Sequence, residues 1–157
     1  MTQNIKKQYV QWQEVEALCA LVHKKIVNDR YQPDLLIGLS RGGLIPLGYL
    51  SGEKMFDIRD TYAIALRSYD HTKQGALSVR VPVHAQDFQR YKSILVIDDL
   101  IDSGKTMSFV LSLLQQHAGN AKVRTVVLFY KSAKASITPD YYAQETENWI
   151  VFPWEKE

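Results

Sequence analysis

The densest group of side chains that could do chemistry lies between Val96 and Thr106. A hydrophobic run leads into two adjacent acids, Asp98 and Asp99, which are followed by two apolar residues and a third acid, Asp102. Carboxylates in this arrangement can accept hydrogen bonds from vicinal sugar hydroxyls or hold Mg²⁺. The segment therefore predicts a site for a polyol, a divalent cation or both.

The turn that follows, Ser103-Gly104-Lys105-Thr106, has the composition of a phosphate site. Its backbone N–H groups and hydroxyls would lie at a helix N-terminus, where unpaired donors and the helix dipole attract phosphate. Gly104-Lys105-Thr106 also resembles the end of a P-loop, but that motif needs glycine where this chain has Asp99. Helix capping explains one acid and not three, since three carboxylates around one turn repel each other without a cation or polyol.

The hydrophobic pattern predicts the elements that position these residues. Spacings of three and four predict helices over 11–28, 44–53 and 105–117, the last ended by Gly119. Short apolar runs predict strands over 35–39, 61–66, 77–83, 94–97 and 123–130, with loops over 40–43 and 98–104. Short strands are expected within 141–155 as a small C-terminal hood. The alternation of predicted strands and helices along the chain predicts an α/β fold with a central, mostly parallel, twisted sheet flanked by helices.

Composition narrows the class of protein. The 157 residues, 46% of them hydrophobic, suit one globular domain over 1–157. A net charge of +2 without runs of like charge gives no footprint for nucleic acid, and the longest apolar stretch is too short for membrane insertion. The single cysteine, Cys19, excludes an internal disulfide. With a polar N-terminus, these features predict a cytoplasmic protein.

The segment from Val96 to Thr106 resembles the phosphoribosyl pyrophosphate signature of the type I phosphoribosyltransferases and fits it at every position. The resemblance extends from about residue 12 to residue 155. Residues 40–46 look like the pyrophosphate loop, and residues 68–71 look like the mobile loop that closes over the reaction centre. Residues 131–157 are similar to the base pocket of the xanthine-guanine subgroup and are expected to contribute that pocket here.

The resemblance implies a Mg²⁺-dependent enzyme of purine salvage. It would transfer the phosphoribosyl group from phosphoribosyl pyrophosphate to xanthine, guanine or hypoxanthine, giving a nucleoside 5′-monophosphate and pyrophosphate. Asp102 would be the general base, and Asp99 or Asp98 would hold the metal. The residues implied to bind phosphoribosyl pyrophosphate are Ser40, Arg41, Gly42, Gly43, Asp98, Asp99, Asp102, Ser103, Gly104, Lys105 and Thr106.

Base recognition is implied for three residues near the C-terminus. Lys131 would donate to a purine 6-oxo group, Trp149 would stack on the base, and the Ile150 carbonyl would face its Watson–Crick edge. Ser68 and Tyr69 would belong to the flexible loop. The expected partners are small-molecule substrates and further copies of the chain, as a dimer or tetramer.

Two residues depart from the xanthine-guanine pattern. Lys105 replaces a glycine, and Val151 stands where bacterial members carry an acid, which leaves the preferred base open. A regulatory protein that senses phosphoribosyl pyrophosphate without turnover is one alternative, although Asp102 and Arg41 favour an enzyme. A phosphoribosyltransferase for adenine or a pyrimidine is another, although Lys131 and Trp149 favour a 6-oxopurine.

Overall fold

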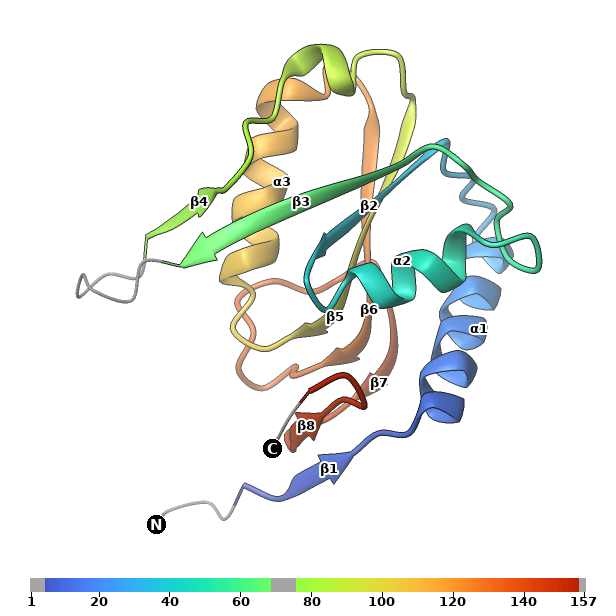
Figure 1. Ribbon diagram of the computed structural model, residues 1–157, viewed down its shortest axis with the longest axis vertical. Coiled ribbons are helices and arrows are strands. Elements are labelled where there is room, and N and C mark those ends of the chain that lie inside the picture. The colour runs from blue at the N-terminus through green and yellow to red at the C-terminus, as the bar shows by residue number, and fades with distance from the viewer. Residues whose placement is uncertain (1–4, 69–75, 156–157) are drawn as a thin grey trace.

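A six-stranded sheet forms the centre of the computed structural model, which describes residues 5–68 and 76–155 (Figure 1). The strand order is β4-β3-β2-β5-β6-β7, with β4 antiparallel to β3 and the other neighbours parallel. This mostly parallel sheet confirms the predicted α/β fold. Its strands are β2 (Leu35–Ser40), β3 (Thr61–Ser68), β4 (Leu77–Val79), β5 (Ser93–Ile101), β6 (Lys122–Tyr130) and β7 (Tyr141–Glu145).

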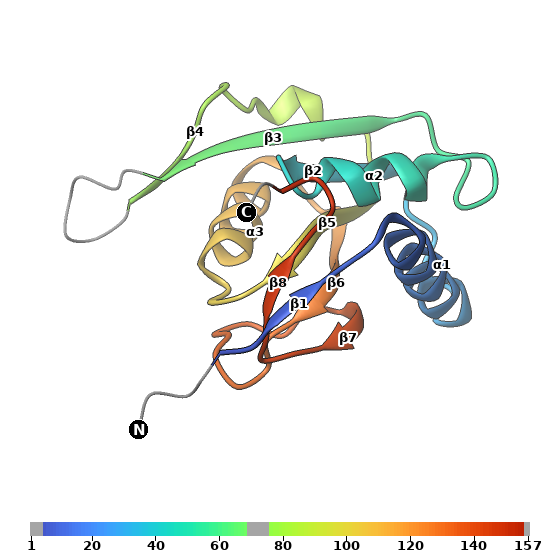
Figure 2. The same ribbon diagram turned by 60° about the horizontal axis from the view of Figure 1, so that its bottom comes forward.

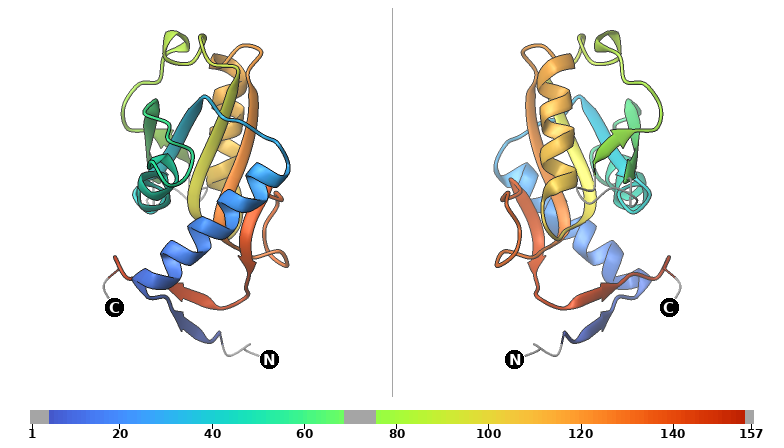
Figure 3. Two further views of the ribbon diagram at one scale, coloured as in Figure 1. Left: turned by 90° about the vertical axis from the view of Figure 1, so that its right-hand side faces the viewer. Right: turned by 90° about the vertical axis from the view of Figure 1, so that its left-hand side faces the viewer.

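Helices cover both faces of the sheet, and Figure 3 shows α1 and α3 on opposite sides of it. The first face carries α1 (Trp12–Asn28) and α2 (Leu44–Ser51), and the second carries α3 (Lys105–His117). Residues of β5 alternate between the two faces, with Leu95 packing toward α1 and Val96 toward α3. A central parallel strand is therefore apolar on both faces. No helix within the described ranges is long and apolar enough to cross a bilayer.

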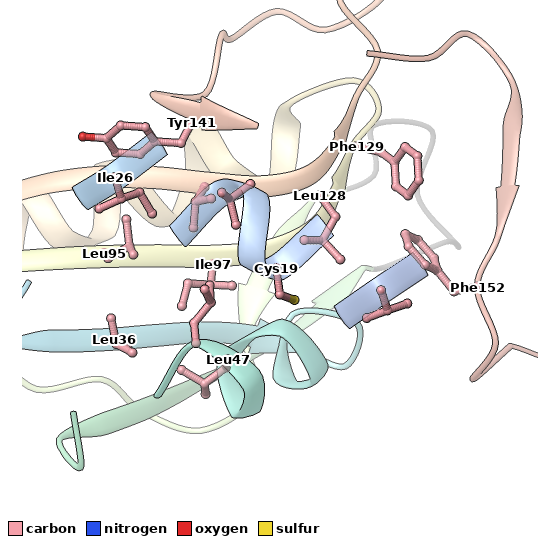
Figure 4. Close-up of a cluster of buried hydrophobic side chains, with 14 of the residues drawn as sticks. Cys19, Ile26, Leu36, Leu47, Leu95, Ile97, Leu128, Phe129, Tyr141 and Phe152 are labelled. Carbon is pink, nitrogen blue, oxygen red and sulfur yellow. The ribbon is translucent and has the colours of Figure 1, made fainter. Parts of the chain in front are cut away.

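The core under α1 and α2 explains why α1 forms where the periodicity predicts it. Val15, Cys19, Val22 and Ile26 are the buried residues of α1, and their spacing places them on one face of the helix. Figure 4 shows Cys19 and Ile26 packing toward the sheet, together with Leu47 of α2. Burial raises the pKa of the Cys19 thiol to about 12, so this cysteine is a packing residue.

Four predicted boundaries were wrong by two residues or more. The strand predicted over 61–66 continues to Ser68, which pairs with Leu77 of β4. The loop predicted over 98–104 is strand as far as Ile101, because Leu100 and Ile101 continue the pairing with β6 opposite Phe129 and Tyr130. The strand predicted over 77–83 ends at Val79, where its pairing with β3 ends. Helix α2 ends at Ser51 and not at 53, because Gly52 has an extended backbone with ψ of 163°.

A separate two-stranded ladder lies beside the sheet, formed by β1 (Lys7–Tyr9) and β8 (Trp149–Val151) in parallel (Figure 2). Strand β8 thus forms part of the predicted C-terminal hood, but the sequence did not predict β1 as its partner. The other C-terminal strand, β7, does not lie over the sheet end as expected. It joins the sheet as an edge strand paired with β6.

Candidate active site

The carboxyl ends of β2 and β5 open onto a pocket of about 1280 Å³, which Lys131 borders just beyond the end of β6. In parallel sheets this edge is where ligands bind. The β1–β8 ladder supplies the facing wall through Lys7, Trp149, Ile150 and Val151, and Figure 1 shows it beyond these strand ends. The charged residues that line the pocket are Lys7, Arg41, Asp99, Asp102, Lys131 and Glu155.

The turn between β5 and α3 requires glycine at Gly104 for two reasons. Its φ is +86°, and an added Cβ would lie 2.6 Å from Cγ2 of Ile137. The first N–H groups of α3 have no backbone partners inside the helix. The Lys105 N–H donates to Oγ of Ser103 at 3.4 Å, and Thr106 adds a second hydroxyl to this turn. The turn, Lys105 included, lies outside the pocket lining but directly follows Asp102, which lines it.

The loop after β2 packs its glycines against β5. An added Cβ at Gly42 would lie 1.9 Å from Oδ2 of Asp99, so the Asp99 carboxylate fills the space beside this loop. At Gly43 a Cβ would lie 2.5 Å from the Ile97 carbonyl oxygen. The Gly43 N–H donates to the Leu39 carbonyl at 2.9 Å. This N–H is therefore not free to bind phosphoribosyl pyrophosphate, although Gly43 was expected to contribute to that site. Ser40 ends β2 and precedes the loop, and its peptide bond to Arg41 is cis.

The two adjacent acids have unfavourable surroundings for two negative charges. Burial raises the pKa of Asp98 well above its usual range, and the charge of Asp99 adds to that effect. Burial also raises the pKa of Asp99, with a further contribution from the charge of Glu155. Asp98 also accepts a hydrogen bond from the Asp99 N–H at 2.9 Å. Hydroxyl donors or a cation would relieve the repulsion.

Asp102 follows β5 between the acid pair and the phosphate turn, and two ammonium groups contact it. Its Oδ1 lies 2.9 Å from Nζ of Lys134 and 3.5 Å from Nζ of Lys131. Burial acts to raise the pKa of Asp102, but the two lysines outweigh it and hold that pKa below its usual value. Asp102 is therefore ionised at neutral pH. Its Oδ1 is buried beside the two ammonium groups, and the ionised carboxylate can accept a proton.

Lys131 and Trp149 lie next to each other although 18 positions separate them in the chain. Lys131 is 7% exposed, and its N–H donates to the Ile101 carbonyl at 3.0 Å, which fastens it beside the end of β5. Its ammonium lies 5.9 Å from the centroid of the Trp149 ring. Trp149 is 57% exposed and lines the pocket, so a planar ligand can stack on it.

The backbone of Ile150 faces away from β1. Trp149 donates its N–H to the Lys6 carbonyl at 2.9 Å, and the Val10 N–H donates to the Val151 carbonyl at 3.0 Å. Because alternate residues of a strand pair with the same neighbour, the N–H and C=O of Ile150 point to the other edge of β8. Ile150 also lines the pocket, so these groups can meet a planar ligand there.

The structure therefore brings seven of the sixteen predicted site residues to the lining of one pocket: Arg41, Gly42, Asp99, Asp102, Lys131, Trp149 and Ile150. Ser68 is the last residue of β3, and Tyr69, with the rest of the predicted mobile loop, lies outside the described residues. Sequence reasoning missed Lys134, Glu155 and Lys7 as site residues. Lys134 and Glu155 fall within residues 131–157, to which the resemblance assigned the base pocket, whereas no signal pointed to Lys7.

Comparison with known proteins identifies the family of this chain. A family profile described as phosphoribosyl transferase domain matches residues 6–157. The xanthine-guanine phosphoribosyltransferase of Idiomarina loihiensis is 33% identical over 150 residues, covering 94% of this chain and 86% of that protein. The structure of a purine phosphoribosyltransferase from Pyrococcus horikoshii is 32% identical, with a TM-score of 0.81 and coverage of 96% and 95%. The Helicobacter pylori xanthine-guanine-hypoxanthine phosphoribosyltransferase is 29% identical, with a TM-score of 0.83 and coverage of 95% and 94%.

Proposed function

The chain belongs to the phosphoribosyltransferase family, and we propose that it acts in purine salvage. It would transfer the 5-phosphoribosyl group from phosphoribosyl pyrophosphate to a 6-oxopurine, namely xanthine, guanine or hypoxanthine. The observation that carries the proposal is the position of ionised Asp102 between a phosphate-type turn and the Lys131–Trp149 pair. The similar proteins from three organisms, all named for purine substrates, support it.

Asp102 would serve as the general base. In the transfer, the bond from C1′ to a purine nitrogen forms while the bond from C1′ to pyrophosphate oxygen breaks, and the purine imidazole loses a proton. The ionised Asp102 carboxylate would accept that proton. Arg41 and the Gly42 N–H, beside the same pocket, would hold the departing phosphates.

The rest of phosphoribosyl pyrophosphate would lie along the end of β5. Ser103, Gly104, Lys105 and Thr106 would bind the 5′-phosphate through the first N–H groups of α3, which have no backbone partner inside the helix, and through the two hydroxyls. The carboxylates of Asp98 and Asp99 would accept hydrogen bonds from the ribose hydroxyls. Ser40 and Gly43 would act by shaping the pyrophosphate loop, because the Gly43 amide is already engaged.

The base would be recognised by residues 131–157. Trp149 offers an exposed ring for stacking, and the buried Lys131 beside it can donate to a 6-oxo group, which adenine lacks. The outward backbone groups of Ile150 would meet the Watson–Crick edge. Because Val151 carries no charge, Glu155 is the acid that this part of the chain brings to the pocket.

Mg²⁺ fits the acids at the end of β5. Asp98 and Asp99 have raised pKa values, and the charge of Glu155 is directed at Asp99, so a cation would relieve their repulsion. Among the described residues no three His, Cys, Asp or Glu side chains form a complete metal site. Mg²⁺ often completes its shell with water and substrate phosphates, so Asp99, or Asp98, would hold it together with substrate oxygens. When bound, it would neutralise charge on the leaving pyrophosphate.

We also propose a cellular compartment and an assembly state for the enzyme. A lone, buried cysteine suits a reducing compartment, so we place the enzyme in the cytoplasm. We also propose a homo-oligomer, which light scattering on the purified protein would test.

An ultraviolet assay tests the function. Purified protein with Mg²⁺ and phosphoribosyl pyrophosphate is given guanine, hypoxanthine, xanthine or adenine in parallel. We expect conversion of at least one 6-oxopurine, loss of turnover with EDTA and recovery with excess Mg²⁺. Conversion of adenine alone would refute the assigned acceptor. If no base is converted while phosphoribosyl pyrophosphate still binds in calorimetry, a sensor without turnover replaces the enzyme.

A further inference from the structure

We propose that Lys134 is a positioning residue that holds the Asp102 carboxylate, so that Lys131 is free to bind the oxo group of the base. The inference rests on the proposed function and deepens it. It concerns segment 131–137, which follows β6 and from which the sequence had singled out Lys131 alone.

Segment 131–137 is fastened to the phosphate turn, so Lys134 has a defined position. The N–H groups of Lys134 and Ala135 donate to the Lys131 carbonyl at 3.1 and 2.9 Å, which closes a turn. Ser136 then donates twice to the Ser103 carbonyl, from its N–H at 2.9 Å and its Oγ at 3.0 Å. This anchoring directs Lys134 toward the carboxylate that precedes the phosphate turn.

Two ammonium groups share one carboxylate oxygen, but their surroundings differ. Nζ of Lys134 lies 2.9 Å from Oδ1 of Asp102, and Nζ of Lys131 lies 3.5 Å from the same atom. The side chain of Lys131 is 9% exposed and faces the Trp149 ring, whereas that of Lys134 is 60% exposed and lies outside the pocket lining. Lys131 can therefore reach a base, and Lys134 remains with Asp102.

Two counterions allow Asp102 to stay ionised while Lys131 binds the base. If Lys131 alone balanced Asp102, donation to the oxo group would draw away its counterion when Asp102 must be ionised to accept a proton. With Lys134 in place, Asp102 keeps one counterion throughout, and Lys131 loses little by turning toward the base. Lys134 thereby separates recognition of the base from activation of the proton acceptor.

Other charged groups surround Asp102. Asp99 of β5, Glu155 beyond β8 and Arg41 after β2 line the same pocket, and Lys105 begins α3. In contrast to these groups, Lys134 and Lys131 contact Asp102 and lower its pKa. Removal of Lys134 should therefore raise the pKa of Asp102 directly. The other charged groups around Asp102 are the same in the wild type and in the variant.

The first test measures the Asp102 carboxyl in the free protein without Mg²⁺. Carbon NMR titrations compare the wild type, Lys134→Ala, Lys134→Arg and the exposed control Lys24→Ala, with Asp102→Asn identifying the resonance. We expect Lys134→Ala to raise the pKa of Asp102 by about 0.2 to 0.7 unit, the scale of a partly exposed ion pair. Lys134→Arg and Lys24→Ala should leave it unchanged. An unmoved pKa in Lys134→Ala overturns the proposal.

The second test uses turnover of a 6-oxopurine. In Lys134→Ala the acidic limb of kcat/KM should move to higher pH by the same amount, and KM for the base should rise about 2- to 5-fold because Asp102 retains Lys131. KM for phosphoribosyl pyrophosphate should stay constant, and Lys134→Arg should restore both properties. An unmoved limb with an active wild type overturns this role alone. A wild type that turns over no base overturns the proposed function and this role together.

Discussion

Gly42→Ala tests whether the position of the Asp99 carboxylate matters. An added Cβ would lie 1.9 Å from Oδ2 of Asp99, whereas ordinary contact begins at 3.4 Å, so the carboxylate must move by about 1.5 Å. Gly42 has no positive φ, so alanine adds no backbone strain there. Rotation of the Asp99 side chain can make room, at about 0.5 to 1.5 kcal/mol if it leaves its preferred rotamer. The substitution therefore displaces one functional group at small cost in stability.

Such a displacement should reduce kcat/KM for phosphoribosyl pyrophosphate by about 10²-fold, the scale for a misplacement of roughly 1 Å. The concentration of Mg²⁺ that gives half-maximal rate should also rise, because Asp99 is the proposed metal ligand. Steady-state kinetics over a Mg²⁺ series measures both quantities, and chemical denaturation measures the free energy of unfolding.

Gly48→Ala is the matched control. Gly48 lies within α2, and an added Cβ there meets nothing within 4 Å. Alanine should stabilise the helix by about 0.5 to 1 kcal/mol without changing turnover. If Gly42→Ala kept its activity within about threefold at unchanged Mg²⁺ dependence, far from the 10² expected, the placement of Asp99 at the reaction centre would be refuted.

Three other substitutions test separate parts of the site. Asp102→Asn should lower kcat by about 10²-fold or more in steady-state assays with KM for phosphoribosyl pyrophosphate unchanged, as loss of a general base predicts; near-normal turnover would exclude that role. Lys131→Ala should reduce discrimination against adenine in a competition assay, and unchanged selectivity would contradict its contact with the oxo group. Gly104→Ala should lower the free energy of unfolding by about 1 to 3 kcal/mol in urea titrations, because alanine at a φ of +86° is strained and its Cβ meets Ile137; equal stability would contradict the described turn.

Features that depend on neighbours in sequence could be predicted from the chain alone. The spacing of Val15, Cys19, Val22 and Ile26 placed α1 within one residue of its observed limits, because one face of a helix repeats every three or four residues. The signature around Asp102 likewise predicted the end of a strand, a glycine turn and a helix start, which are short-range backbone properties. Its predicted loop began too early, since the pairing of Leu100 with Phe129 extends β5 and no local pattern carries that partner.

The composition of the base pocket could not be predicted in the same way. Val151 stands where bacterial members carry an acid and left the preferred base open, and Glu155 comes to the pocket from four residues further on. Trp149 and Ile150 are oriented by β1, a strand of three residues that is too short and too polar to leave a hydrophobic pattern. Pairing between the two ends of the chain decides where these residues face.

The order of amino acids sets the types of group available for the reaction: a phosphate turn, an acid pair, a further carboxylate, a lysine and an aromatic ring. How these groups act on one another follows from the folded arrangement. Asp102 meets Lys131 and Lys134 because β5 and β6 are adjacent in the sheet and Ser136 binds the phosphate turn. The charge state of Asp102 depends on those distances, since electrostatic interaction is set by separation in space and by burial, not by separation along the chain.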